Sequence, residues 1–439
     1  MDAKQIVELS KRHTITSWSA QGKVAPLAVE RASGIYFWDC DGKRYIDFNS
    51  QLMCVNVGHN HPKIVAAVKA QADKLMFVYP GCVTEARARL GQLLAELVPG
   101  DINTFFFTNG GAEANEAAIK AVRLFTGRHK ILSRYRSYHG ATAGVMQLTG
   151  DPRRWATEPG APGFVRVMDP IPYRYSFGAT EEEQTRNNLT YLSEVIDYEG
   201  PQNIAAMFIE PVIGSNGIQP PPRGWLEGLR ALLDRHGILL VCDEVMAGFG
   251  RTGKMFSFQH GGIAPDIITM AKGLTSAALP LGAMGMSDKI AAHFRDNVFW
   301  SGLTYSSHPM GLAAAVAALE VLRDEKLVDN AARMEGVMRS HMARLKDKHP
   351  SVRAFRATGL FGALDFQKNR AGDPLGSYNA THEGIGKLLV ALRDKGLFTL
   401  SHWNTLYCNP PLCITEPQLA EAFGIIDEAL AVTDAYVKD

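Results

Sequence analysis

Hydrophobic and polar positions follow two alternating patterns through the middle of the chain. Seven short apolar runs predict buried strands, and segments with helical periodicity, such as 112–126 and 223–236, lie between several of them. The runs are 104–108, 131–133, 164–168, 205–210, 238–243, 267–271 and 282–286. This alternation predicts an α/β fold, a largely parallel seven-stranded sheet with helices on both faces. Functional groups are then expected at the carboxyl ends of the strands.

The two ends of the chain have a different pattern. Residues 1–33 predict a helical and then an extended segment, and Asp41-Gly42 predicts a hairpin between two apolar runs. Beyond residue 310, helical periodicity over 311–323, 385–396 and 416–437 surrounds one predicted strand at 359–366. We therefore expect a smaller α+β domain built from residues 1–60 and 311–439, beside a large domain at 61–310.

Composition excludes several classes of protein. The 439 residues carry a net charge of +1 without a basic or acidic block, so we expect neither nucleic acid nor a membrane as partner. No apolar stretch is long enough to cross a bilayer, and the N-terminus lacks the apolar core of a signal peptide. The six cysteines form no CxxC pair, which favours reduced thiols and a cytoplasmic protein.

Two predicted strands end in residues of opposite charge. Lys272 follows the run at 267–271 and precedes Gly273, and Asp243 ends the run at 238–243. A solvated lysine and a helix-capping or ion-paired aspartate are the simpler interpretations of each residue alone. Together they are what pyridoxal phosphate requires, because the amine forms a Schiff base and the carboxylate keeps the ring nitrogen protonated.

A small-residue stretch follows the first strand of the series. Gly110, Gly111 and Ala112 open the helix predicted at 112–126, where backbone N–H groups can approach a phosphate and the helix dipole favours its charge. A tight turn between strand and helix explains the same residues. The stretch is therefore a candidate phosphate site that needs support from other motifs.

Two further strand ends carry candidate residues. Tyr138 and His139 precede Gly140, and the tyrosine ring could stack on a planar heteroaromatic ring, although a core or turn aromatic is the commoner case. Glu210 ends the run at 205–210 and is a candidate to orient a neighbouring group or contact a substrate.

Two patterns point to other chemistries. Gly248–Lys254 matches both GxGxxG and GxxxxGK, which would suit a nucleotide-binding ATPase. Residues 243–247 separate it from the strand, and Met255 stands where a phosphate-binding loop has Ser or Thr, so this alternative is disfavoured. His59 and His61 lack a convincing set of partner ligands, and no metal is expected.

Taken together, these motifs resemble the class III pyridoxal phosphate aminotransferases, which have fold type I, the aspartate aminotransferase fold. The resemblance extends from about residue 15 to 435, with the motifs in the family's order. Its phosphate loop corresponds to 110–115, its ring-stacking motif to 138–140 and its pyridinium-binding strand to 242–245. Its Schiff-base segment corresponds to 266–272, and a segment that reaches the partner subunit's cofactor to 302–309.

The resemblance assigns roles around the cofactor ring. It implies that Lys272 forms the Schiff base and then moves the proton between the substrate carbon and the cofactor. It implies that Asp243 keeps the pyridine an electron sink, and that Val245 packs on the ring face opposite Tyr138.

The resemblance also implies an assembly. Backbone groups at Gly111 and Ala112, with Thr304 of a second chain, would hold the phosphate. Since Thr304 then acts in trans, we expect a homodimer or a dimer of dimers. The expected reaction is ping-pong, with pyridoxamine phosphate formed between the two half-reactions.

Three positions depart from better-known members of the family and bear on the substrate. Ala141 stands where 4-aminobutyrate and ornithine enzymes carry Arg, Leu400 where many ω-aminotransferases carry a mobile Arg, and Met53 where β-alanine–pyruvate relatives carry Trp. The chain therefore looks most like the branch that uses taurine and related ω-amino acids. The predicted substrate pocket contains Trp18, Met53, Leu400 and His402, with Lys23 and Trp403 as further candidates to hold an acid group.

The expected function is transfer of an amino group from a primary ω-amine or ω-amino acid, such as taurine or β-alanine, to a 2-oxo acid, pyruvate or 2-oxoglutarate. An aminomutase or decarboxylase on the same fold is an alternative that would not need an exchangeable acceptor. The nucleotide-binding ATPase using Gly248–Lys254 and a non-catalytic scaffold that binds the cofactor are alternatives from other classes.

Overall fold

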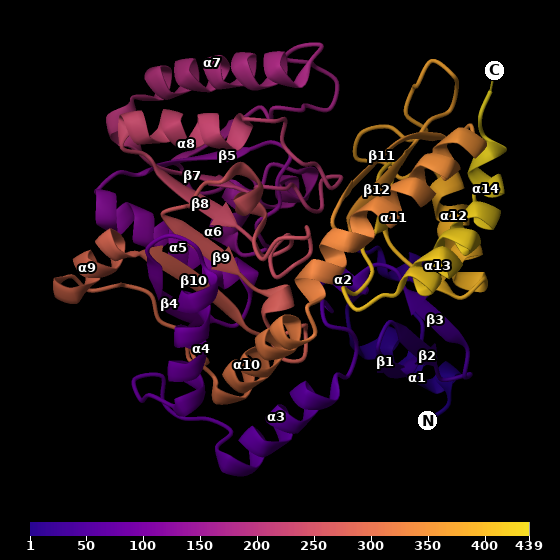
Figure 1. Ribbon diagram of the computed structural model, residues 1–439, viewed down its shortest axis with the longest axis horizontal. Helices are drawn as coiled ribbons and strands as arrows, with labels where there is room; N and C mark the ends of the chain where they lie inside the picture. Colours follow the sequence, from indigo (N-terminus) through magenta and orange to yellow (C-terminus); the bar gives the residue numbers. More distant parts are fainter. Residues whose placement is uncertain (439) are drawn as a thin grey trace.

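The computed structural model describes residues 1–438 and places all seven predicted strands in one sheet (Figure 1). They are β4 (Ile102–Thr108), β5 (Lys130–Arg134), β6 (Phe164–Val167), β7 (Ile204–Ile209), β8 (Leu239–Asp243), β9 (Ile267–Met270) and β10 (Gly282–Ser287). Their order across the sheet is β4-β10-β9-β8-β7-β5-β6. Only β10 runs antiparallel to its neighbours, so the largely parallel seven-stranded sheet is confirmed.

Helices cover both faces of this sheet. The helices α5 (Gly111–Thr126) and α6 (Ala143–Leu148) lie on one face, and α4 (Glu85–Leu97) and α8 (Trp225–His236) on the other. Val241 of β8 packs into the core on the α5 side, whereas Leu240 and Cys242 pack into the core on the α8 side. Burial from both sides explains why these strands are continuous apolar runs rather than alternating ones.

Several further helices lie between residues 62 and 324. They are α3 (Pro62–Lys74), α7 (Glu181–Glu199), which packs on α8, α9 (Asp288–Asp296) and α10 (Pro309–Asp324), which packs on α3 and α4. A capping box at the start of α7, in which Thr180 and Glu183 bond to each other's backbone N–H groups, satisfies the donors that the helix leaves open.

The N-terminal region forms a small sheet with the far end of the chain. After α1 (Ala3–His13), the strands β1 (Val29–Ser33), β2 (Tyr36–Asp39) and β3 (Arg44–Asp47) lie side by side, and the predicted hairpin joins β2 to β3. Gly42 provides the left-handed backbone, with φ 83°, that this turn needs. The fourth strand is β13 (Leu397–Phe398), which pairs with β3. In Figure 1 the indigo N-terminal strands lie next to the yellow C-terminal helices.

The C-terminal region contains more strands than the sequence predicts. Its elements are α11 (Leu327–Lys348), β11 (Val352–Thr358), β12 (Phe361–Phe366), α12 (Glu383–Asp394), β14 (Ser401–His402), β15 (Thr405–Cys408), α13 (Glu416–Ala429) and α14 (Ala431–Asp434). A sheet of order β11-β12-β15-β14 surrounds the one predicted strand, now β12. The single helix predicted at 416–437 is two helices, α13 and α14, which Leu430 separates.

None of the helices within residues 1–438 has the length and apolar character needed to cross a membrane.

Candidate active site

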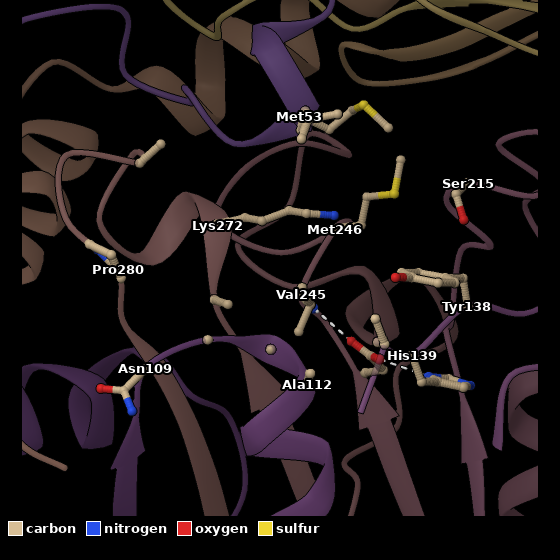
Figure 2. A pocket seen from close by; sticks show the side chains of 18 of the residues that line it. Met53, Asn109, Ala112, Tyr138, His139, Ser215, Val245, Met246, Lys272 and Pro280 are labelled. Atoms are coloured by element: carbon tan, nitrogen blue, oxygen red, sulfur yellow. Dashed lines mark hydrogen bonds and ion pairs between the residues drawn. The ribbon is translucent and has the colours of Figure 1, made fainter. Parts of the chain in front are cut away.

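A cavity of about 550 Å³ opens at the carboxyl ends of the parallel strands. The strand ends bring together Asn109 after β4, Tyr138 and His139 after β5, Asp243 at the end of β8 and Lys272 after β9, all of which line it (Figure 2). Glu210, directly after β7, lines it as well. This is the place where an open parallel sheet gathers functional groups from distant parts of the sequence.

Lys272 begins a short 3₁₀ helix (Lys272–Leu274) in a left-handed backbone conformation, with φ 47°. Gly273 must follow it, since a Cβ there would lie 2.5 Å from Nδ2 of Asn56. The side chain crosses the cavity toward Met246 (Figure 2), and its burial lowers the pKa of the amine. Burial of this kind shifts a lysine toward its neutral, nucleophilic form.

Asp243 is buried and held on both carboxylate oxygens. Oδ2 accepts a hydrogen bond from Nδ2 of Asn115 at 2.8 Å and lies 2.7 Å from Nδ1 of His139. Oδ1 accepts from the backbone N–H of Val245 at 3.0 Å. Asn115 is itself fixed by the hydroxyl of Thr269, which donates to its Oδ1 at 2.8 Å. The network gives the carboxylate one orientation, which suits a site for a cationic ring N–H.

Asn115 and Thr269 lie inside the motifs that resemble the family, but the sequence did not predict that they hold Asp243. Both are polar residues at fully buried positions, within the apolar patterns of α5 and β9. A polar residue in a core-facing position was the available signal, and only the fold shows that it supports Asp243.

Glu210 orients the ring-stacking candidate. Its Oε1 accepts from the backbone N–H of Tyr138 at 2.9 Å, and its Oε2 from that of Gly214 at 2.8 Å. Burial raises the pKa of Glu210. The carboxylate therefore holds the loop that carries Tyr138 against the end of β7.

The glycines at the start of α5 allow three elements to meet closely. A Cβ at Gly111 would lie 2.9 Å from both γ-carbons of Val245, and one at Gly140, where φ is +140°, would lie 2.6 Å from Cβ of Ala112. Gly110 caps α5 without a side-chain hydrogen bond, so the first N–H groups of the helix face the cavity without a side-chain cap. Such a helix end attracts a phosphate.

Arg153 is a site residue that the sequence did not predict. Its guanidinium lies over the ring of Tyr138, with Cζ 3.7 Å from the ring centroid, and lines the cavity. Nε donates to Asp151 at 2.8 Å, and Nη2 donates to the hydroxyl of Ser215 at 3.0 Å. Trp18 meets the same tyrosine edge-on at 6.1 Å. One cation thus stands in an otherwise mostly apolar wall.

The predicted pocket residues do not all line this cavity. Trp18 and Met53 do. Leu400 packs behind them on the cluster that contains Met53, and His402 stacks on Trp403, with ring centroids 4.3 Å apart, in the wall of a neighbouring cavity. Lys23 is exposed on a 3₁₀ turn (Gln21–Lys23) away from the cavity lining.

Thr304 is exposed on the surface of the single chain and does not line the cavity. That position agrees with the predicted role in a partner subunit's site, which stays a prediction.

The nucleotide-binding motif lies at a packing junction. Arg251, fully buried, donates hydrogen bonds to the carbonyl of Leu360 at 3.2 Å, the hydroxyl of Ser50 at 2.9 Å and Oδ1 of Asn56 at 3.1 Å. Lys254 donates to the carbonyl of Gln259 at 3.0 Å. The loop thus joins the large domain to both ends of the chain, and no helix longer than a 3₁₀ turn follows it.

The residues present fit pyridoxal phosphate. A buried amine, a fixed buried carboxylate, an aromatic ring and an uncapped helix N-terminus face one cavity, as the lysine, ring nitrogen, ring face and phosphate of the cofactor require. The Nε2 of His139 is buried and has no hydrogen-bond partner within residues 1–438.

Comparison with known proteins identifies the family. The family model for class-III aminotransferases matches residues 18–430. The structure of a taurine:2-oxoglutarate aminotransferase from Bifidobacterium kashiwanohense, in complex with pyridoxal phosphate and glutamate, is 41% identical, with a TM-score of 0.97 over 100% of this chain and 99% of that one. An (S)-enantioselective ω-transaminase from Thermomicrobium roseum is 35% identical, with a TM-score of 0.93 over 99% of both chains.

A curated relative supports the same assignment. The mitochondrial γ-aminobutyrate transaminase 1 of Oryza sativa subsp. japonica is 31% identical over 95% of this chain and 83% of its own length. The fold is that of the fold type I transaminases, as expected. The chain therefore belongs to the class III aminotransferases, enzymes that depend on pyridoxal phosphate.

Proposed function

We propose that this aminotransferase moves an amino group from a primary ω-amine with an acidic end group, such as taurine or β-alanine, to a 2-oxo acid, pyruvate or 2-oxoglutarate. The observation that carries this proposal is Arg153, the cation in a mostly apolar pocket wall. The similarity of the whole chain to a taurine:2-oxoglutarate aminotransferase supports the same donor class.

In this proposal Arg153 holds the sulfonate or carboxylate at the far end of the donor. Asp151 and Ser215 accept hydrogen bonds from Nε and Nη2 of Arg153 and so fix the plane of its guanidinium. The ring of Tyr138 lies against one face of that plane. A fixed guanidinium binds an oxyanion with little loss of entropy. The arginines that related enzymes carry at the positions of Ala141 and Leu400 are therefore not needed to hold the acid group.

Other residues hold and serve the cofactor. Pyridoxal phosphate, when bound, withdraws electrons from the substrate carbon that bears the amine and stores the amino group between the half-reactions. We assign the amine of Lys272 to anchoring it and to moving a proton at that substrate carbon, and the carboxylate of Asp243 to holding the proton on the ring nitrogen. His139 keeps Asp243 in place through its Nδ1.

The remaining assignments concern the ring faces and the phosphate. Tyr138, positioned by Glu210, and Val245 both line the cavity and would hold the cofactor ring. The backbone of Gly110, Gly111 and Ala112 binds the phosphate, together with Thr304 of a second chain. The donor leaves as an aldehyde before the 2-oxo acid binds, so the order is ping-pong.

We also propose that two chains form the working unit, alone or as part of a dimer of dimers. Large apolar side chains gather on the surface near Thr304, where Phe77 lies 6.0 Å from Tyr305, and both rings are exposed. An exposed apolar patch of this kind marks a site of protein association.

Replacing Arg153 tests the donor class. Arg153→Met should raise the KM for taurine and β-alanine by about 10- to 100-fold, since a hydrogen bond to a charged group contributes about 1.5–3 kcal/mol, and should leave an uncharged ω-amine nearly unchanged. Arg174→Met, a change at an exposed arginine, is the matched control. Equal losses for charged and uncharged donors, or no loss for either, would refute the proposal.

A further inference from the structure

A second cavity, of about 250 Å³, lies between the two domains beside the substrate pocket. Its walls come from the loop after β5, from residues 171–173 and 216–219 of the large domain, and from β11, β12 and residues 402–405 of the small domain. The catalytic roles proposed above use none of these residues.

Arg136 contributes an unpaired cation to this cavity. Its Nη1 and Nη2 donate to the carbonyls of Ile171 and Asn216 at 3.2 and 2.6 Å, and its buried Nε has no hydrogen-bond partner among residues 1–438. The carboxylates of Asp169 and Asp365 attract the guanidinium from beyond ion-pair distance. Each of them is already paired with another arginine, Asp169 with Arg134 and Asp365 with Arg356. A buried charge held only by carbonyls is costly unless an anion accompanies it.

The other charges of the cavity do not neutralise Arg136. Asp365 is the only carboxylate among the lining residues, and Arg356 and the hydroxyl of Thr405 occupy both its oxygens. Arg353, exposed at the rim, adds a third guanidinium. Three arginines against one carboxylate leave the lining itself positive, with Asp169 as a further negative charge near Arg136.

His402 supplies a neutral polar group to the same space. Its Nε2 is buried without a hydrogen-bond partner in the described part of the chain. Burial lowers the pKa of His402 to about 4, so the ring is neutral at neutral pH and can donate one hydrogen bond. Stacking on Trp403 fixes the ring plane.

The two cavities share a wall. Arg136 binds the carbonyl of Asn216, and Arg153 binds the hydroxyl of the preceding Ser215. The carbonyl of Ser215 also accepts a hydrogen bond from the hydroxyl of Tyr407. A ligand in the second cavity would therefore sit against the backbone that supports the proposed anchor of the substrate.

We propose that this cavity is a second anion site, which binds a small carboxylate between the guanidinium groups of Arg136 and Arg353, beside His402. The planar guanidinium groups suit a carboxylate, and carboxylic acids are the acceptors and products that an aminotransferase brings to this pocket. The volume admits a molecule the size of an amino acid. The site does not depend on the donor class proposed above.

Calorimetric titration of the holoenzyme with succinate, an unreactive dicarboxylate, tests the site. The titrations use Arg153→Met as background, so that the substrate pocket does not contribute a strong anion site. We expect one binding event in this background, weakened at least 10-fold when Arg353→Gln or Arg136→Gln is added. Arg295→Gln, the same charge change at an exposed position elsewhere, should leave it unchanged.

Several outcomes would contradict the proposed anion site. They are the absence of a binding event, an equal loss with Arg295→Gln, unchanged binding in both cavity variants, and tighter binding of inorganic phosphate than of succinate. Arg353 is exposed, so its variant decides the question where thermal melting shows that Arg136→Gln does not fold. Activity with taurine is not part of the readout, and failure of the donor proposal would leave this result intact.

Discussion

At the scale of single residues, burial sets the chemistry of the site. Lys272 combines a left-handed backbone with a buried amine, and Asp243 has a buried carboxylate that Asn115, His139 and Val245 hold in one orientation. The left-handed backbone of Lys272 and the burial of both charged groups each cost folding stability. Such strain is typical of functional positions.

Lys272→Ala should reduce kcat by at least about 10³-fold, because it removes both the anchoring amine and the group that moves the proton. The protein should still bind pyridoxal phosphate through the phosphate and ring contacts. Steady-state rates and the cofactor content of the purified protein check both points. Lys254→Ala changes an exposed lysine of the same chain and should retain activity, and near-normal turnover by Lys272→Ala would contradict the assignment.

Glu244, beside Asp243, predicts a pH dependence of stability. Burial raises the pKa of Glu244 to about 7. Hydrogen bonds from Ser257 and Phe258 favour the charged form and only partly offset this rise. Since the folded pKa exceeds the unfolded one, this contribution to stability is complete below pH 4.5 and is lost as the pH rises through 7.

Over that range, the wild-type free energy of unfolding should fall by up to about 3 kcal/mol relative to that of Glu244→Gln. Urea denaturation of both proteins between pH 4.5 and 8 measures the difference. Parallel curves would show that Glu244 does not titrate in this range.

The sequence predicted the two residues whose signal is local. Lys272 and Asp243 each end an apolar run, where a charge is conspicuous. Arg153 had no such signal, because it lies in a short 3₁₀ helix (Pro152–Thr157) and reaches the site only when that helix packs over Tyr138. His402 was placed in the substrate pocket by analogy, and the structure places it in the wall of the second cavity.

At the scale of elements, close contact between the start of α5 and the loop after β5 shapes the proposed phosphate site. Gly140 lies against Ala112, and Gly111 against Val245. These contacts leave no room for a β-carbon, so the glycines determine how near the ring-stacking loop and the helix end can lie.

Gly140→Ala should separate these elements. The added Cβ would lie 2.6 Å from Cβ of Ala112 in a backbone region that alanine disfavours, so we expect a loss of about 1–3 kcal/mol in stability and weaker cofactor binding. Thermal melting and cofactor titration measure the two effects. Gly424→Ala lies in α13 with open space around it and should not destabilise, and a Gly140→Ala protein that matches it would contradict this account.

The sequence predicted those strands and helices whose local pattern alone identifies them. The seven strands of the large sheet were found because each contains an apolar run, and the strands β7 to β10 are buried on both sides. The C-terminal strands β11, β13, β14 and β15 were missed. Of these, β13 and β14 have only two residues each and depend on a partner strand for their pairing. No local pattern could specify that β13 pairs with β3 near the other end of the chain.

At the scale of the whole molecule, we propose that the chain forms two domains. Residues 61–310 form the large domain, and residues 1–60 and 311–439 together form the small one. The β3–β13 pairing supports this grouping of the two ends. The buried Arg251 binds Ser50 and Leu360, one from each end, and so joins the large domain to both.

A subunit-mixing experiment tests the role of Thr304 in trans. Thr304→Ala and Lys272→Ala homodimers should both be impaired, the first through weaker cofactor binding. A mixed dimer of the two contains one site with a native Lys272 and, from its partner, a native Thr304, so it should regain about half of the wild-type activity per dimer. Mixtures no more active than the Thr304→Ala protein would show that Thr304 acts within its own chain or not at all.

The most direct test of the central claim is the visible spectrum of the purified holoenzyme while single amine donors are added without an acceptor. We predict that taurine or β-alanine bleaches the absorbance band of the lysine-bound cofactor, and that pyruvate or 2-oxoglutarate restores it. A band that no ω-amine changes would leave the family assignment standing and contradict the proposed substrate class.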